Sequence, residues 1–67
     1  MWKFNVEALK MVREEKNMTM REASKGLGVT FQAIHNWESG KAVPSLKNML
    51  KLCHEYGLKP SAFFKEV

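Results

Sequence analysis

Cysteine is almost absent from this 67-residue chain, since Cys53 is its only thiol. One cysteine cannot form an internal disulfide, so covalent cross-links are excluded as the source of stability. The apolar core has to hold the fold instead. The composition fits a reducing compartment, and we expect a cytoplasmic protein.

Long apolar runs are also missing. Lys3, Asn5 and Glu7 interrupt the apolar residues at the N-terminus, so no apolar signal-peptide segment can be drawn there. No segment approaches the roughly 20 apolar residues that cross a bilayer. Internal repeats and low-complexity segments are absent too. We expect one domain over residues 1–67 and no membrane partner.

Patterns that would indicate catalysis or metal binding are lacking as well. The sequence has no nucleophile beside an evident base, no glycine-rich loop followed by lysine, and no paired carboxylates in an apolar setting. His35 and the Cys53-His54 pair fall on different predicted helix faces, and they lack zinc-finger spacing. We therefore expect neither an enzyme nor a metal site, cofactor or small-molecule ligand.

The charge of the chain is unbalanced toward the positive side. Eleven Lys and Arg face seven Asp and Glu, which gives a formal net charge of +4. This is the sign expected for a partner that is a polyanion such as nucleic acid. Many basic proteins bind no nucleic acid, so the charge alone leaves the function open.

Apolar residues at helical spacing, separated by capping residues and glycines, predict five helices. The expected N-caps are Asn5, Thr19, Thr30 and Ser45. The expected ends are Asn17, Gly26 or Leu27, Gly40 and Gly57, with a last helical turn from Pro60 to Phe64. Thr19 and Glu22 have the spacing of a capping box.

Two of these helices have faces that can be assigned from their sequence. The third helix places Ala33, Ile34 and Trp37 on one side, and it places Phe31, Gln32, His35 and Asn36 on the other. For the fourth helix, we expect the inward residues to be Leu46, Met49, Leu50, Cys53 and Tyr56.

The short second and third helices, joined by a turn at Gly26–Thr30, form a helix-turn-helix pattern. Such a motif needs a small residue where its helices touch, a glycine in the turn, and apolar anchors on the buried side of the second helix. Ser24, Gly28, Ile34 and Trp37 supply these in register. In this motif the second helix lies in the DNA major groove.

The chain resembles the phage-repressor and Cro-type helix-turn-helix proteins, often called the XRE family, from about Leu9 to Phe64. The matching segments are Val12–Lys16, Met18-Thr19, Leu27–Thr30, Gln32, Ile34, Trp37–Lys41, Pro44–Leu46, Gly57-Leu58 and Phe63-Phe64. The resemblance implies a compact, all-α, lambda-repressor-like domain of five helices whose third helix reads base edges.

The resemblance also implies roles for individual residues. Base reading falls to Phe31, Gln32 and Asn36, with His35 beside them. The candidate phosphate contacts are Thr19, Met20, Ser39, Lys41, Ser45, Lys47 and Asn48. Arg13 and Glu38 are expected to form a structural ion pair. Met20 departs from the family, which usually has a glutamine there, so only backbone amides could face a phosphate at that place.

The two leading base-reading candidates could also have roles that involve no DNA. Gln32 could be a solvated surface residue, and Phe31 could cover the edge of the core. With the motif around them, we favour an adenine or guanine contact for Gln32 and a thymine methyl contact for Phe31.

The predicted function is transcriptional regulation by a homodimer that binds a roughly palindromic operator of double-stranded DNA. Cro-like regulators, restriction-modification controllers and autorepressing antitoxins stay open as subtypes. Dimer contacts are expected among Trp2, Phe63, Phe64 and Val67. The alternative is a protein-interaction module or antitoxin-type partner-binding domain that uses Tyr56, Leu58, Phe63, Phe64 and Val67.

Overall fold

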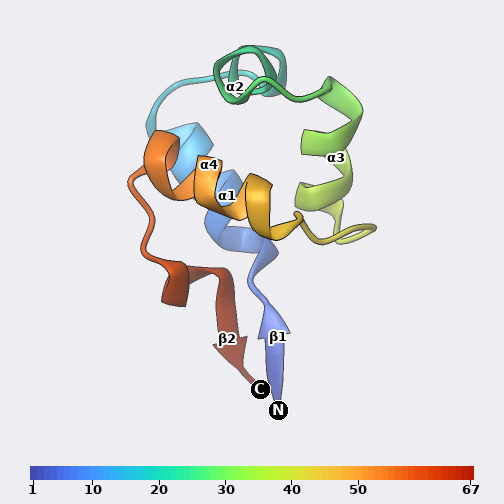
Figure 1. Cartoon of the computed structure of the whole chain (residues 1–67), viewed down its shortest axis with the longest axis vertical. Coiled ribbons are helices and arrows are strands. Elements are labelled where there is room, and N and C mark those ends of the chain that lie inside the picture. The colour runs from blue at the N-terminus through green and yellow to red at the C-terminus, as the bar shows by residue number, and fades with distance from the viewer.

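The computed structural model describes all residues from 1 to 67 as four α-helices, a 3-10 turn and a small sheet (Figure 1). The helices are α1 (Val6–Glu15), α2 (Met20–Leu27), α3 (Phe31–Ser39) and α4 (Leu46–Tyr56), and the 3-10 turn η1 spans Pro60–Phe63. The strands are β1 (Trp2–Phe4) and β2 (Phe64–Glu66). None of the helices has both the length and the apolar character that a bilayer crossing requires.

The expected all-α fold of five helices is wrong at the chain ends. The segment predicted as a fifth helix is a 3-10 turn of four residues, because so short a segment cannot nucleate an α-helix. Phe64 leaves that turn and begins β2, which pairs antiparallel with β1 in the register Phe4 to Phe64. The two termini therefore lie side by side at one end of the molecule (Figure 1).

Side-chain caps form at three of the four predicted N-caps. Thr19 and Glu22 make a complete capping box at α2, and Thr30 and Ser45 accept backbone N–H bonds at the starts of α3 and α4. Asn5 precedes α1 but caps nothing with its side chain. The Asn5 amide instead donates to the Ala62 carbonyl at 3.4 Å, so it ties α1 to η1.

The core is built from residues of all four helices and of η1. Part of the inward face predicted for α4 is wrong. Leu52 is fully buried, whereas Leu46 and Leu50 are 74% and 61% exposed. Tyr56 is buried as predicted, and Cys53 is half-buried against the core. Apolar residues occur on two sides of α4, so periodicity alone offered two stripes, and packing selected the one with Leu52 and Tyr56.

Candidate DNA-binding surface

The α2–turn–α3 unit has the local geometry of a helix-turn-helix. Gly28 ends α2 with a φ of 69°, a left-handed conformation that residues other than glycine adopt only with strain. The Val29 N–H then donates to the Ser24 carbonyl at 3.0 Å, which closes the turn. Ser24 is buried. The two helices consequently pack closely and hold α3 at a fixed angle to α2.

The face of α3 opposite the core carries all four residues predicted to read bases. Ile34 and Trp37 are almost fully buried and anchor the helix. Phe31 and Gln32 are exposed, while His35 and Asn36 are half-buried. At its N-terminal end, α3 therefore presents Phe31 and Gln32 to solvent, whereas His35 and Asn36 are only partly accessible and the His35 Nδ1 is buried without a hydrogen-bond partner.

Gln32 and Asn36 meet on this face. The Gln32 Nε2 donates to the Asn36 Oδ1 at 2.9 Å. The bond fixes the orientation of both amides, because each has one atom committed. The Gln32 Oε1 and the Asn36 Nδ2 remain as a neighbouring acceptor and donor, which is the combination that an adenine edge requires.

An aromatic pair lies beside these amides. The Phe31 ring stacks on His35 with centroids 6.4 Å apart and an interplanar angle of 29°. The Arg21 guanidinium of α2 lies 4.8 Å from the centroid of the same Phe31 ring. Arg21 was not predicted from the sequence, because it is ten positions from Phe31 and on another helix.

The predicted phosphate contacts differ in what they still have to offer. Lys41 and Lys47 are exposed. The Ser39 hydroxyl already donates a hydrogen bond to the Asn36 carbonyl within α3. The Thr19 amide is already bound by the Glu22 carboxylate at 2.9 Å. Hydrogen bonds from Thr19, led by its backbone N–H, hold the pKa of Glu22 below its usual range. An ionised carboxylate thus occupies the start of α2 and repels a phosphate there.

The remaining candidates lie in or near caps. Met20 is half-buried and packs against the core. Its thioether has no N–H or O–H group to donate to a phosphate. The Ser45 hydroxyl accepts from the Asn48 N–H at 3.2 Å. Ser45 and Asn48 lie at the start of α4, near the exposed Lys47. The N-terminal end of α4 therefore keeps more capacity for a phosphate than the start of α2 does.

Arg13 and Glu38 lie in contact and join α1 to the end of α3. The Arg13 Nε and Nη2 donate to the two Glu38 carboxylate oxygens at 2.7 and 2.9 Å, and the Nη1 donates to the Met18 carbonyl at 2.8 Å. Their side chains are only 10% and 4% exposed. The hydrogen bonds that Arg13 donates to the Glu38 carboxylate raise the pKa of Arg13. Nearby Tyr56 is buried, and its pKa rises to about 12.

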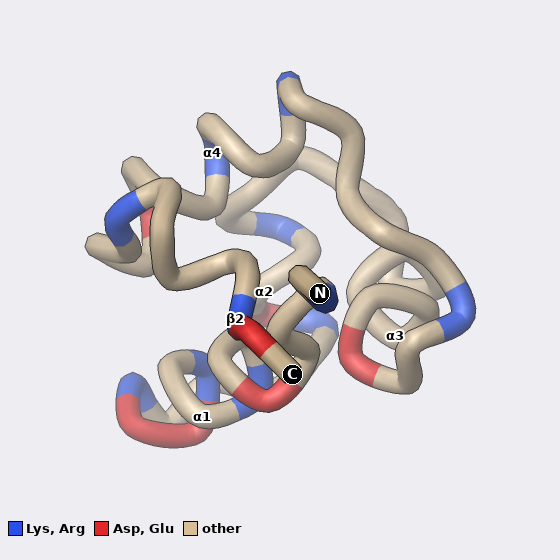
Figure 2. The backbone as a smooth tube through the Cα atoms, turned by 90° about the horizontal axis from the view of Figure 1, so that it is seen from below, with Lys and Arg blue, Asp and Glu red and all other residues tan.

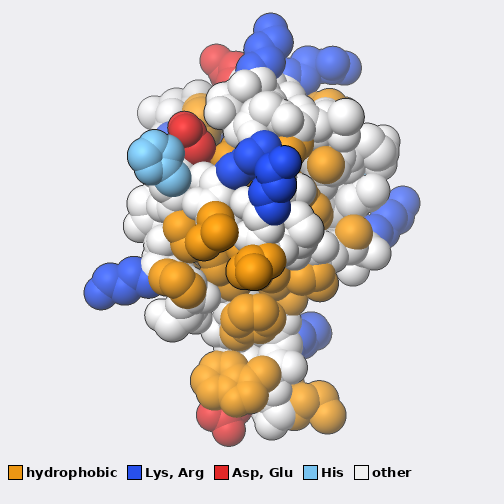
Figure 3. Space-filling model, in the orientation of Figure 1, with side chains coloured by type: hydrophobic (Ala, Val, Ile, Leu, Met, Phe, Trp, Pro, Cys, Tyr) orange, Lys and Arg blue, Asp and Glu red, His pale blue; other side chains and the backbone are white.

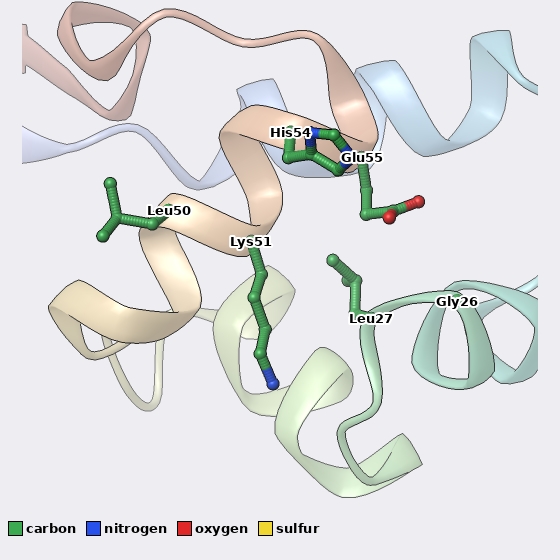
Figure 4. Close-up of a pocket in the computed structure, with 6 residues that line it drawn as sticks. All are labelled: Gly26, Leu27, Leu50, Lys51, His54 and Glu55. Carbon is green, nitrogen blue, oxygen red and sulfur yellow. The ribbon is translucent and has the colours of Figure 1, made fainter.

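The distribution of basic residues by itself does not identify the candidate DNA-binding surface. Lys and Arg positions are spread over α1, α4 and the loop after α3 (Figure 2). A hollow of about 420 Å³ lies between the end of α2 and α4, with Lys51 extending toward the α2–α3 turn (Figure 4). None of the sequence-predicted site residues lines it. The candidate surface is accordingly the outward face of α3, and a smaller hollow of about 130 Å³ beside it is lined by Met20, His35, Glu38 and Ser39 together with Lys10.

These features define a helix-turn-helix protein, with two short helices, a glycine turn and an outward face on the second helix. The chain belongs to the family described as Helix-turn-helix, whose sequence profile matches residues 9–63. This agrees with the predicted resemblance to the XRE type.

Known relatives lie in bacteria and archaea. The chain is 34% identical over 58 residues to the HTH-type transcriptional regulator PuuR of Escherichia coli strain K12, with 87% of this chain and 31% of that protein covered. The chain therefore spans about a third of the length of that relative. It is 39% identical over 56 residues to an uncharacterised HTH-type transcriptional regulator of Methanocaldococcus jannaschii, with 84% and 85% covered.

Proposed function

We propose that this protein is a transcriptional regulator that binds double-stranded DNA sequence-specifically and places α3 in the major groove. The observation that carries the proposal is the outward face of α3, where Gln32 and Asn36 are held by their mutual bond beside the exposed Phe31. Family membership and relatives named as transcriptional regulators support it. Selection of bound sequences from random duplex DNA tests it, since a protein without sequence preference would enrich nothing.

Base reading and phosphate binding respond differently to mutation. Gln32→Ala should weaken binding to the selected operator by about 1 to 3 kcal/mol and hardly change non-specific affinity, because it removes a base-edge contact. Lys41→Ala should weaken good and poor sites alike and reduce the log-log salt slope by about one per protomer. Both variants are measured on the operator and a scrambled duplex at several salt concentrations.

Lys59→Ala is the matched control for Lys41→Ala. Lys59 is exposed and belongs to the connection between α4 and η1. This connection runs on the opposite side of the molecule from α3 (Figure 1). This variant loses the same charge and should keep the salt slope of the unmodified protein. A flattened salt slope for Gln32→Ala, with discrimination intact, would contradict the assignment of α3 as the reading helix.

We further propose that the protein acts as a homodimer on a roughly palindromic operator. Single exposed apolar residues are normal, but a gathered patch is typical of an interface. Hydrophobic side chains form a band on the face that carries α4 and the strands (Figure 3). The exposed apolar residues of these elements are Trp2, Leu46, Leu50 and Phe64. A two-fold pair bound to adjacent half-sites would have to place its two α3 helices about 34 Å apart, one turn of DNA.

The structure corrects two earlier assignments on this face. Phe63, expected among the dimer contacts, is 1% exposed and belongs to the core. Tyr56 is buried too, so the surface suggested for a protein-interaction module lacks two of its five residues. In the proposed dimer interface, the exposed Leu46 and Leu50 stand in place of Phe63.

Leu50→Glu should convert the dimer to a monomer, because a carboxylate cannot be buried across the two-fold axis without a partner. Sedimentation at tens of micromolar, free and on the operator, measures this. Met11→Glu is the control, since Met11 is 55% exposed on α1 among charged neighbours and should leave the dimer intact. A monomer of unmodified protein in both conditions would contradict dimerisation.

A further inference from the structure

Arg21 is held over the reading helix by an aromatic contact. Its guanidinium comes from the first turn of α2 and lies 4.8 Å from the ring centroid of Phe31, the first residue of α3. Phe31 in turn stacks on His35, one helical turn further along. The three side chains form a column on the outward side of the helix-turn-helix, and the contact restricts the guanidinium to the N-terminal end of α3.

The donors of this guanidinium are not used within the chain. Arg21 is exposed and takes part in neither of the two ion pairs. Its neighbour Glu22 is committed to the Thr19 amide. The chain has one other arginine, Arg13, whose donors are bound to Glu38 and to the Met18 carbonyl. Arg21 is therefore the arginine that is free to make a planar, two-bond contact.

We propose that Arg21 is a specificity-determining residue that donates two hydrogen bonds to O6 and N7 of a guanine in the major groove. A guanidinium that lies on an aromatic face keeps its N–H edge available, and its fork matches the two guanine acceptors. The N-terminal residues of a reading helix approach base edges, and Phe31 holds Arg21 at that end. This inference rests on the proposed function, and it adds a guanine to the site that Gln32 and Asn36 read.

The test uses the operator obtained by selection with the unmodified protein. Selection is repeated with Arg21→Lys and Arg21→Ala, and we expect one guanine position per half-site to lose its preference with both variants. Affinity for the original operator should fall roughly 5- to 150-fold, the range for a bidentate base contact. Lysine should not rescue it, because an ammonium lacks the planar fork. Lys25→Ala, at an exposed basic position of the same helix, should retain the guanine preference.

A modified base locates the contact. Replacing that guanine by 7-deazaguanine removes the N7 acceptor, so the unmodified protein should bind several-fold more weakly while Arg21→Ala should show no further loss. Phe31→Leu should likewise reduce the guanine preference when Arg21 is present, because the guanidinium loses its aromatic contact. In the Arg21→Ala variant, Phe31→Leu should have no effect on the guanine preference. Since Arg21 is exposed, thermal unfolding should be similar for all of these variants.

Two results would overturn the assignment. If Arg21→Lys bound like the unmodified protein while Arg21→Ala lost operator and scrambled duplex equally with a smaller salt slope, Arg21 would be a phosphate contact. If the Arg21 variants selected the same guanine as before, the residue would have no part in reading. Failure of the unmodified protein to select any sequence would instead refute the proposed function itself.

Discussion

Leu52→Ala should lower the free energy of unfolding by about 2 to 5 kcal/mol, while Leu50→Ala should change it by less than about 0.5 kcal/mol. The two leucines are two positions apart on α4, but Leu52 is 0% exposed and Leu50 is 61% exposed. Truncating Leu52 leaves a cavity among the core residues, which a domain of 67 residues has little capacity to offset. Urea denaturation followed by circular dichroism measures both values.

Protein concentration provides the control for this comparison. If Leu50 contributes to a dimer interface, its truncation should matter more at high concentration, whereas the loss at Leu52 should persist at low concentration. Equal losses for both variants at low concentration would mean that α4 is rotated relative to the described packing.

Glu38→Ala should destabilise the fold by about 3 to 5 kcal/mol, the range for removing one partner from a buried ion pair. The Arg13 guanidinium would keep its bond to the Met18 carbonyl but lose both bonds to the carboxylate. With a side chain only 10% exposed, it cannot recover these bonds fully from water. The double variant Arg13→Met with Glu38→Leu should regain part of the loss, because no charge then remains buried.

The surface pair of Glu7 and Lys65 is the matched control. The Lys65 Nζ lies 3.1 Å from the Glu7 Oε2, but the side chains of Glu7 and Lys65 are 62% and 39% exposed. Water solvates either charge when its partner is removed, so Glu7→Ala should shift the unfolding midpoint far less than Glu38→Ala does. Equal loss in Glu38→Ala and in the double variant would contradict an energetic role for the buried pair.

Local interactions explain what the sequence predicted well. The Thr19–Glu22 capping box, the caps at Thr30 and Ser45, and the left-handed Gly28 join residues no more than four positions apart. Their geometry follows from backbone sterics and nearby hydrogen bonds, which a short stretch of sequence specifies. The outward face of α3 was equally predictable, because Ile34 and Trp37 fix the rotation of that helix.

The sequence by itself thus determined the helix-turn-helix and the residues presented on α3. Only the tertiary structure decided the pairing of β1 with β2, the burial of Leu52 in place of Leu50, and the position of Arg21 over Phe31. Each of these depends on segments that are distant in the chain or on separate helices. Helical periodicity reports the faces of one element, but it carries no information about which other element packs against each face.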